Sequence, residues 1–519
     1  MQAWERRAAW TLLAGAAAGH VACRPPAPPP APVRPLVVAL PIGPASLVPN
    51  AANDGFTLSG MANVYETLVD LDAHLRIRPC LAESWHTADD LTWTFRLRAG
   101  IRRHDGEVLK AADVAESLRW ARDDPSSKRQ AELAPVVSIE APDDRTIMLR
   151  THRPYPGLPL RLSLVTLAAR SRDGAPVGTG PYRIRSWTPS GDLVLQAFPE
   201  HRSPPAITDV QYRVIPRTVD QVQALRDGTA HLLFELPAAE LRALAGAPGI
   251  ATVTRDGLRI LFLGMDTSRA ASPHVRARVN PLRDRRVRQA VAQAIDRRSL
   301  VEGPLGGLAE VLDQIASPLE LGGDRGGLPS WPFDPDASRR LLAQAGFPGG
   351  FEVVFDYMPA RYRAGEAVTE AIVAMLAEVG IRAVPRANTP AQFLSRLERE
   401  DTALYLFGWS SDTGDPGLSY EYLLHSRREG LGLDNGGGYA NPEADRLIRE
   451  ASARRGPEER ASVLRRLAEI VHDDAAVVPL YRQADLYAAA ADLLFEPRLD
   501  ARVRVDEMSW RGPAAGAPR

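Results

Sequence analysis

This chain has few cysteines, 2 in 519 residues, and almost no excess of charge of either sign, with a net charge of −1. A disulfide framework needs several cysteines at regular spacing, so we expect no disulfide scaffold, and Cys80, among apolar neighbours, is expected to be a small buried hydrophobe. No basic patch is dense enough for nucleic acid. Beyond the N-terminal segment there is no run of about 20 apolar residues, which predicts a soluble body.

The sequence also lacks the short motifs of common catalytic and cofactor sites. GxSxG, HExxH, Walker and GxGxxG patterns are absent, and the 10 histidines show no i, i+3 or i, i+4 pairs. Asp412 and Asp415 are three residues apart in one predicted loop, so they cannot flank a bond from opposite faces. We therefore predict a binding protein with no catalytic residue, cofactor or metal. An exported hydrolase is the remote alternative.

The N-terminus has the features of a bacterial export signal. Two arginines precede an apolar stretch at 8–18 that is too short to span a bilayer. Cys23 follows, and the Pro-rich segment 24–35 is expected to be an extended linker. The arrangement resembles a lipoprotein signal, residues 1–23, with Cys23 lipidated. His20 stands where such signals usually carry Leu, so cleavage without a lipid is the alternative, and both predict a periplasmic protein.

Strand-like and helix-like segments alternate through the rest of the chain, which predicts a mixed α/β fold with several sheets. The predicted strands cover residues 34–40, 91–98, 146–149, 193–197, 209–214, 351–357, 382–385, 404–409 and 480–486. The predicted helices cover residues 110–122, 284–296, 334–346, 366–379, 442–454 and 457–473.

The segment LYLFGWSSDTGDP, residues 404–416, is the most informative about function. An apolar run to Trp409 predicts a buried strand, and it stops abruptly at turn residues. Ligands bind at strand ends in α/β sheets, and this strand end presents Trp409, Asp412 and Asp415. A carboxylate beside an indole suits a cationic or ammonium-bearing ligand. The alternative interpretation is a solvated acidic loop whose aspartates only cap turns.

Eight separated motifs resemble those of the bacterial extracellular solute-binding proteins of family 5, the dipeptide, oligopeptide and nickel-type receptors of ABC importers. They are NVYETLVDLD (63–72), PCLAESW (79–85), TFRLRAGIRRHDGEVLKAADVAESL (94–118), GTGPYRI (178–184), DRRVRQAVAQAID (284–296), FDPDASRRLLAQAG (333–346), GGYANPEADRLI (437–448) and VVPLY (477–481). Each motif is weak alone, and their order and spacing carry the resemblance.

The resemblance implies a periplasmic binding protein-like fold of the Venus-flytrap kind (type II, cluster C), with two hinged lobes and an extra domain. Domain I would combine residues 36–60, 176–268 and 484–512, domain II would cover 61–175, and domain III would cover 269–483. The implied ligand is a short peptide, with a nickel chelate or another small organic solute as the alternative. The implied partner is a membrane ABC permease, and a monomer that does not bind nucleic acid is expected.

The resemblance also implies which residues contact the ligand. The W-x-x-D pattern of peptide-binding members matches Trp409-Ser410-Ser411-Asp412, so Asp412 would pair with the ligand's α-ammonium. Backbone groups near Gly408 and Trp409 would bind the ligand main chain like an added strand. Tyr439 resembles a family aromatic that faces the cleft.

A peptide carboxylate needs a cation, and the segment YMPARYR offers two. Arg361 lies where some dipeptide receptors place an arginine for this purpose, Arg363 is the competing choice, and an exposed arginine without a ligand is the further alternative. Asp415, which precedes a proline, is expected to fix the turn after the site.

Overall fold

The computed structural model divides the chain into two units, Met1–Arg34 and Pro35–Arg519, and the second unit contains all of the helices and strands that the structure describes. Cys23 and nearly all of the predicted signal and linker lie outside the described residues. The structure describes residues 34–188, 190–317, 319–320, 330–359, 361–428 and 430–512.

One large mixed sheet runs through the second unit. Its strand order is β10-β11-β12-β1-β13-β20-β14-β19-β17-β15, with β16 added beside β20 and β18 beside β17. The strands are β1 (Leu36–Leu40), β10 (Tyr182–Trp187), β11 (Leu193–Ala197), β12 (Asp209–Val214), β13 (Leu232–Phe234), β14 (Ile250–Met265), β15 (Val275–Arg276), β16 (Ala309–Val311), β17 (Phe351–Tyr357), β18 (Ile381–Ala387), β19 (Leu404–Trp409) and β20 (Val477–Ala490).

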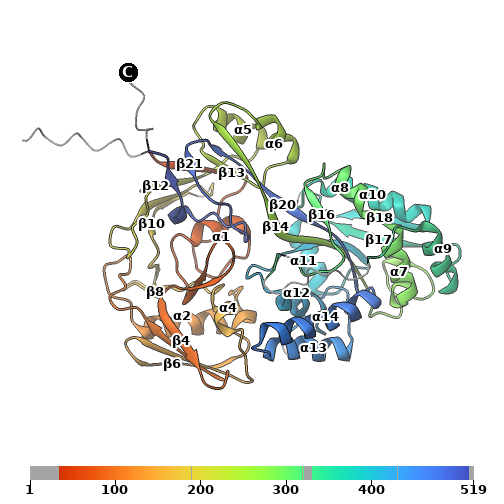
Figure 1. Ribbon diagram of the computed structural model, residues 1–519, viewed down its shortest axis with the longest axis horizontal. Coiled ribbons are helices and arrows are strands. Elements are labelled where there is room, and N and C mark those ends of the chain that lie inside the picture. The colour runs from red at the N-terminus through yellow and green to blue at the C-terminus, as the bar shows by residue number, and fades with distance from the viewer. Residues whose placement is uncertain are drawn as a thin grey trace, which may run out of the picture. The chain divides into compact units, whose positions relative to one another are not determined.

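Two long antiparallel strands, β14 and β20, join the two parts of this sheet. At one end β20 pairs with β13, where Leu232 lies opposite Ala489, and at the other end β14 pairs with β19, where Met265 lies opposite Leu404. Figure 1 shows β14 and β20 side by side between these two parts. Their register shifts between Asp256 and Ile260, so the ladder is locally interrupted midway, where the chain can bend most easily.

A second sheet, separate from the first, contains four antiparallel strands in the order β4-β5-β7-β6. Helix α2 packs beside it, and its buried residues share one hydrophobic cluster with those of the sheet. The elements are β4 (Ala82–Thr87), β5 (Thr92–Leu97), β6 (Val136–Asp143), β7 (Thr146–Thr151) and α2 (Ala111–Asp123).

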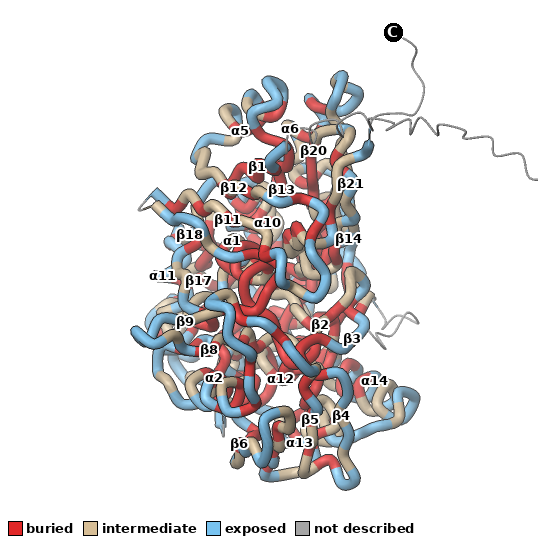
Figure 2. Tube along the Cα trace, turned by 90° about the vertical axis from the view of Figure 1, so that its left-hand side faces the viewer, coloured by how far each residue is buried: buried red, intermediate tan, exposed pale blue. Residues whose placement is uncertain are grey.

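The large sheet carries two main hydrophobic clusters. One surrounds β1 and β10–β13 and includes residues of α1 (Gly55–Met61) and of the C-terminal segment. The other surrounds β17, β19 and the far ends of β14 and β20, covered by α7 (Arg285–Ala294), α9 (Pro335–Gln344), α10 (Gly365–Glu378), α11 (Pro390–Glu398), α12 (Pro416–Leu424), α13 (Pro442–Ala453) and α14 (Pro457–Asp473). Figure 2 shows buried residues along the interior of the trace and exposed residues on the outer turns.

Helix α7 illustrates how local sequence specifies these elements. Asp284 caps it by accepting a hydrogen bond from the Arg286 backbone at 2.8 Å. Val287, Ala290, Val291 and Ala294 form its buried face, as their spacing predicts. A preceding cap and a regular apolar stripe are both readable in the sequence, so the predicted helix over 284–296 is confirmed.

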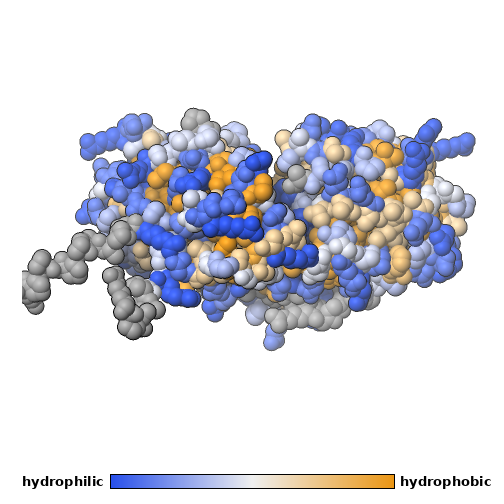
Figure 3. All heavy atoms as spheres, turned by 90° about the horizontal axis from the view of Figure 1, so that it is seen from above, coloured by the Kyte–Doolittle hydropathy of each residue, from blue (hydrophilic) through white to orange (hydrophobic). Residues whose placement is uncertain are grey.

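None of the helices in the described part of the chain has the length and apolar character needed to cross a bilayer. Figure 3 shows hydrophilic residues over much of one face of the molecule, with hydrophobic residues gathered in patches among them.

Candidate ligand-binding cleft

A large cavity lies along β14 and β20, which we call the hinge strands because they join the two parts of the sheet, at the point where β19 ends. It encloses about 1300 Å³ that is open to solvent. One wall comes from α1, the end of β13 and the C-terminal residues 499–502, and the other comes from the loop after β17, from α11 and from the end of β19. Its two walls belong to different hydrophobic clusters, so the cavity lies between two cores of the protein.

The predicted strand over 404–409 is confirmed as β19, and its end forms part of the cavity wall. The two aspartates that follow it have different environments. Asp415 caps α12 by accepting a hydrogen bond from the Gly417 backbone at 2.8 Å, and it also pairs with Arg460 at 2.5 Å. Asp412 lines the cavity with its side chain 33% exposed. The expected turn role of Asp415 is thus confirmed, and the structure leaves Asp412 as the carboxylate of this pair that faces the cavity.

Asp412 has a partner that the sequence does not reveal. The Arg502 Nη2 atom lies 3.1 Å from Asp412 Oδ2, and both residues line the cavity. Ninety positions separate them in the chain, and Arg502 follows an irregular segment with no motif around it. The sheet topology alone brings the C-terminal segment beside the end of β19.

Trp409 also lines the cavity, next to a second carboxylate. Its indole Nε1–H donates a hydrogen bond to Asp434 Oδ2 at 3.0 Å, and its ring centroid lies 5.9 Å from that of Tyr422. Burial raises the pKa of Asp434, and the Trp409 hydrogen bond opposes this rise. The carboxylate beside the indole is therefore Asp434, 25 positions downstream, which a search of the local segment misses.

Gly408 lines the cavity, but its backbone is already engaged. The Tyr362 hydroxyl accepts a hydrogen bond from the Gly408 N–H at 2.8 Å and lies 3.3 Å from the Gly408 carbonyl oxygen. A side-chain carbon at this position would meet Tyr362 Cε1 at 2.6 Å, so only glycine fits. In this arrangement Tyr362 takes up the backbone groups expected to bind a ligand main chain.

The two candidate arginines have different roles. Arg361 is exposed and lines the cavity, with its guanidinium carbon 6.0 Å from the Tyr362 ring centroid. Arg363 donates hydrogen bonds to the backbone carbonyls of Ala484, at 2.7 Å, and Leu308, at 3.3 Å. Burial lowers its pKa. Arg363 thus braces the hinge strand β20, and Arg361 is the arginine of this segment that a ligand can reach.

Tyr439 lies away from the cavity. It is buried in the hydrophobic cluster of β17 and β19, and its hydroxyl donates a hydrogen bond to Asp474 Oδ2 at 2.7 Å. It does not belong to the cavity lining described by the structure. The structure therefore brings Gly408, Trp409, Asp412 and Arg361 together around one cavity and leaves Tyr439 out.

The hinge contributes one more charged group, Asp485 on β20. Burial, reinforced by the nearby Glu235 carboxylate, raises its pKa to about 6, although Arg259 opposes the shift. A side-chain carbon at Gly257 would lie 2.7 Å from Asp485 Oδ2, so a glycine there gives this carboxylate its room. In all, five carboxylates and three guanidiniums line the described cavity, which suits a ligand with charges of both signs. In the described ranges, no cluster of three or more His, Cys, Asp or Glu side chains could hold a metal ion.

Two α/β cores joined by a pair of hinge strands, with a charged cavity between them, define a two-lobed binding protein. A family model for the bacterial extracellular solute-binding proteins, family 5 (middle region), matches residues 76–430. The chain therefore belongs to this family, and the resemblance noted from its motifs is confirmed.

Individual relatives agree with this assignment. The glutathione-binding protein GsiB of Escherichia coli (strain K12) is 25% identical over 464 residues, covering 86% of this chain and 88% of GsiB. Among solved structures, Helicobacter pylori DppA in complex with the peptide STSA superposes with a TM-score of 0.80 at 24% identity, covering 92% of this chain and 98% of DppA. AgaA from A. tumefaciens R10 with agropinic acid also reaches 0.80, at 21% identity, covering 92% and 99%. The predicted periplasmic binding protein-like fold is confirmed.

Proposed function

We propose that this protein is the substrate-binding component of an ABC importer, which captures short peptides in the cleft and delivers them to a membrane permease. The family assignment, the peptide complex of DppA and the glutathione-binding name of GsiB support the proposal. The observation that carries it is the lining of the cleft, where an accessible carboxylate, Asp412, and an accessible guanidinium, Arg361, border the same cavity. A peptide zwitterion offers the complementary ammonium and carboxylate.

In this proposal Asp412 accepts the ligand ammonium, Trp409 forms an apolar wall beside it, and Arg361 binds the ligand carboxylate. A charge-assisted hydrogen bond contributes about 1.5–3 kcal/mol, which is a factor of about 10 to 100 in affinity. Gly408 contributes because it lacks a side chain, which leaves room for the Tyr362 ring beside the cavity.

The remaining expectations extend the same proposal. The protein acts as a monomeric receptor rather than an enzyme, it works in the periplasm, and a lipid on Cys23 anchors it. The three-domain division, 36–60 with 176–268 and 484–512, then 61–175, then 269–483, is supported by hydrophobic clusters that largely follow these boundaries.

Calorimetric titration of the purified protein with a set of di- and tripeptides tests the proposal. Asp412→Asn removes one charge with almost no change in shape, and we expect it to weaken peptide binding about 10- to 100-fold. Asp144→Asn is the matched control, because Asp144 is an exposed carboxylate in the turn before β7 and does not line the cleft. If both variants bind peptides as tightly as the wild type, the ammonium role of Asp412 is wrong.

A nickel chelate or another small organic solute would give a different result in the same experiment. Native mass spectrometry of the protein as purified would then detect a carried-over solute, and no peptide in the set would bind. That combination would keep the receptor function and reject peptides as its ligand.

A further inference from the structure

A second charged cavity, which we call the arginine pocket, lies between the four-stranded sheet and the large sheet. It encloses about 840 Å³ and is open to solvent. Strand β4 and the segment after β5 supply one side, and the segments before β10 and after β11 supply the other. The described linings of the arginine pocket and the cleft share no residue, so the pocket is a separate place on the molecule.

Three arginines line the arginine pocket, and a single residue, Cys80, positions two of them. The Cys80 carbonyl oxygen accepts a hydrogen bond from Arg98 Nε at 2.8 Å, and Cys80 Sγ lies 3.6 Å from Arg202 Nη2. Arg102 is held by a hydrogen bond of 2.9 Å from its Nη1 atom to the Gly106 carbonyl oxygen. A guanidinium has five N–H donors, so these anchoring contacts leave several donors on each arginine.

The carboxylates of the pocket do not neutralise all three arginines. In the part of the chain that the structure describes, Arg98 forms no ion pair. Glu83 is already bound by Arg145 at 2.8 Å. Glu200 is 59% exposed and lies 3.9 Å from Arg102 Nε, a loose pair that water screens. Arg98 and Arg102 therefore keep their charge available for an anion.

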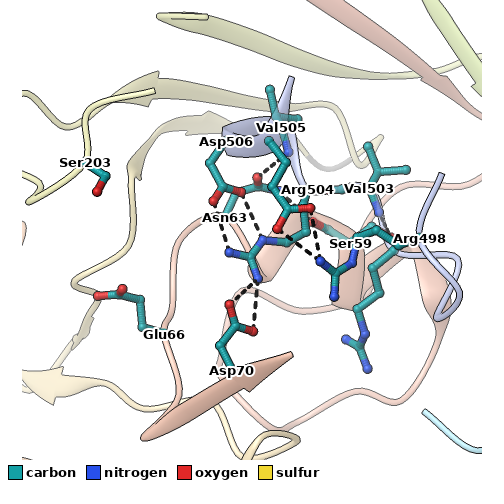
Figure 4. Close-up of polar contacts among 12 residues, drawn as sticks. Ser59, Asn63, Glu66, Asp70, Ser203, Arg498, Val503, Arg504, Val505 and Asp506 are labelled. Atoms are coloured by element: carbon teal, nitrogen blue, oxygen red, sulfur yellow. Dashed lines mark hydrogen bonds and ion pairs between the residues drawn. The ribbon is translucent and has the colours of Figure 1, made fainter. Parts of the chain in front are cut away.

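Arg202, by contrast, is neutralised from behind the pocket by Glu66, whose Oε1 atom lies 2.5 Å from Arg202 Nη2. Figure 4 shows the Glu66 carboxylate turned away from the Asp70–Arg504 pair. Burial acts to raise the pKa of Glu66, but the neighbouring His201 and Arg202 side chains lower it to about 2. Glu66 thus stays ionised and holds Arg202 at the back of the pocket.

Two buried polar atoms beside these arginines lack a hydrogen-bond partner among the described residues. One is the hydroxyl of Thr179, a residue that is 2% exposed and lines the pocket. The other is His201 Nε2, which lies 3.5 Å from Glu66 Oε1 without forming a hydrogen bond. A buried polar group without a partner is costly, so these atoms indicate that something polar occupies the pocket.

We propose that the arginine pocket binds a phosphate-type oxyanion, with Arg98 and Arg102 as its main donors and the Thr179 hydroxyl as a further one. A tetrahedral oxyanion has several acceptor oxygens, which match the fork of N–H donors on a guanidinium. The pocket is larger than a phosphate ion needs, so free phosphate and the phosphate of a lipid head group both fit its chemistry. The inference does not depend on the proposed peptide site.

Calorimetric titration with inorganic phosphate, at an ionic strength held constant with sodium chloride, tests the pocket. We expect the wild-type protein to bind phosphate with a dissociation constant of about 1 mM or lower. Arg98→Gln should weaken this binding about 10- to 100-fold, because a charge-assisted pair is lost. Arg102→Gln should also weaken it, and it replaces the first variant if Arg98→Gln fails to fold. Arg172→Gln is the control, because Arg172 is 97% exposed and lies outside the pocket lining.

Co-sedimentation with vesicles distinguishes the two sources of phosphate. The chain carries Cys23→Ala in this experiment, since a lipid on Cys23 would itself bind vesicles. If the ligand is a lipid head group, the protein sediments with vesicles of phosphatidylcholine and phosphatidylglycerol, and both Arg98→Gln and added inorganic phosphate release it. If the ligand is a free anion, phosphate binds in the titration and the protein stays in the supernatant.

Three results would overturn the inference. The first is no binding of phosphate and none of vesicles. The second is equal binding by the wild type and both pocket variants, and the third is an equal loss in Arg172→Gln and Arg98→Gln, which would indicate unspecific attraction. Each would leave the proposed peptide receptor standing, because the cleft has a separate lining. Phosphate binding without any peptide binding would reject the proposed function alone.

Discussion

A buried ion pair gives the sharpest test of how the parts of this fold are held together. Arg161 on α4 (Leu158–Leu162), which packs with the four-stranded sheet, donates a hydrogen bond to Glu421 on α12 at 2.5 Å. Their side chains are 4% and 6% exposed. Burial acts to lower the pKa of Arg161, but the Glu421 carboxylate outweighs it and raises that pKa. Each charge thus depends on the other for its solvation.

This dependence sets the size of the expected effect. Removing one member of a buried pair leaves the other charge without compensation, which costs about 3–5 kcal/mol. The other contacts of Arg161 in the described chain are a long hydrogen bond of 3.4 Å to the Ala131 carbonyl oxygen and the Tyr155 ring, whose centroid lies 5.3 Å from the guanidinium carbon; neither carries the negative charge of Glu421. Replacing both members by apolar residues of similar volume removes the desolvation penalty as well, and such replacements are often neutral or stabilising.

We therefore expect Glu421→Leu and Arg161→Met each to lower the free energy of unfolding by about 3–5 kcal/mol, and the double variant to lie near the wild type. Urea denaturation measures these energies, and hydrogen exchange of the α4 and α12 peptides reports the loss locally if the cores unfold separately. Glu443→Gln removes one partner of an exposed pair with Arg446 on α13 and should leave stability unchanged. Strictly additive losses in the double variant would refute the argument, because they would mean that the two charges do not depend on each other.

Three further predictions concern the cleft. Gly408→Ala should destabilise the protein by about 1–3 kcal/mol and weaken peptide binding, because the added carbon overlaps the Tyr362 ring. Thermal unfolding measures the first effect and calorimetric titration the second, and an unchanged melting temperature would contradict the overlap. The pKa of Asp485 is raised to about 6, so the folded state keeps this proton to higher pH than the unfolded state, and the free energy of unfolding should fall by up to about 3 kcal/mol as pH rises from about 4 through 6. Asp485→Asn should remove this pH dependence, as measured by urea denaturation at about pH 4 and 8, and an unaltered pH profile in the variant would contradict the assignment to Asp485. Arg363→Met should lower the free energy of unfolding by about 1–3 kcal/mol, because two hydrogen bonds to backbone carbonyls are lost, whereas Arg361→Met should leave stability unchanged and weaken peptide binding. The reverse pattern would show that Arg361 is the structural arginine and Arg363 the ligand-binding one.

Most secondary structure could be predicted because it depends on local periodicity and capping. The strands over 351–357 and 404–409 and the helix over 457–473 match β17, β19 and α14 in their bounds. The hinge strands β14 and β20 were harder to predict from the sequence. The sequence predicts a strand only over 480–486, but β20 spans Val477–Ala490, and it predicts no strand over 250–265, where β14 lies. Strand β14 contains an Asp-Gly step at 256–257, an ordinary turn signal that here marks the register shift.

The cleft could be predicted only where its residues share a local segment. Trp409 and Asp412 follow from one strand end. Arg361 lines the cavity and is exposed, which fits both the predicted carboxylate contact and the alternative of an exposed arginine without a ligand. Asp434, Asp485 and Arg502 could not be found this way, because each reaches the cavity from a different part of the chain. Tyr439 shows the opposite error: its motif is family-like, but its side chain lies in the core and binds Asp474.

The sequence by itself determined the class of this protein. Its alternating segments and the order of eight weak motifs are one-dimensional signals, and they suffice for an α/β solute-binding protein of family 5. Only the tertiary structure decided which charges meet. Electrostatic interactions act through space over a few ångströms, so whether Asp412 faces the cleft alone or beside Arg502 depends on how the sheet brings residues 90 positions apart within 3.1 Å.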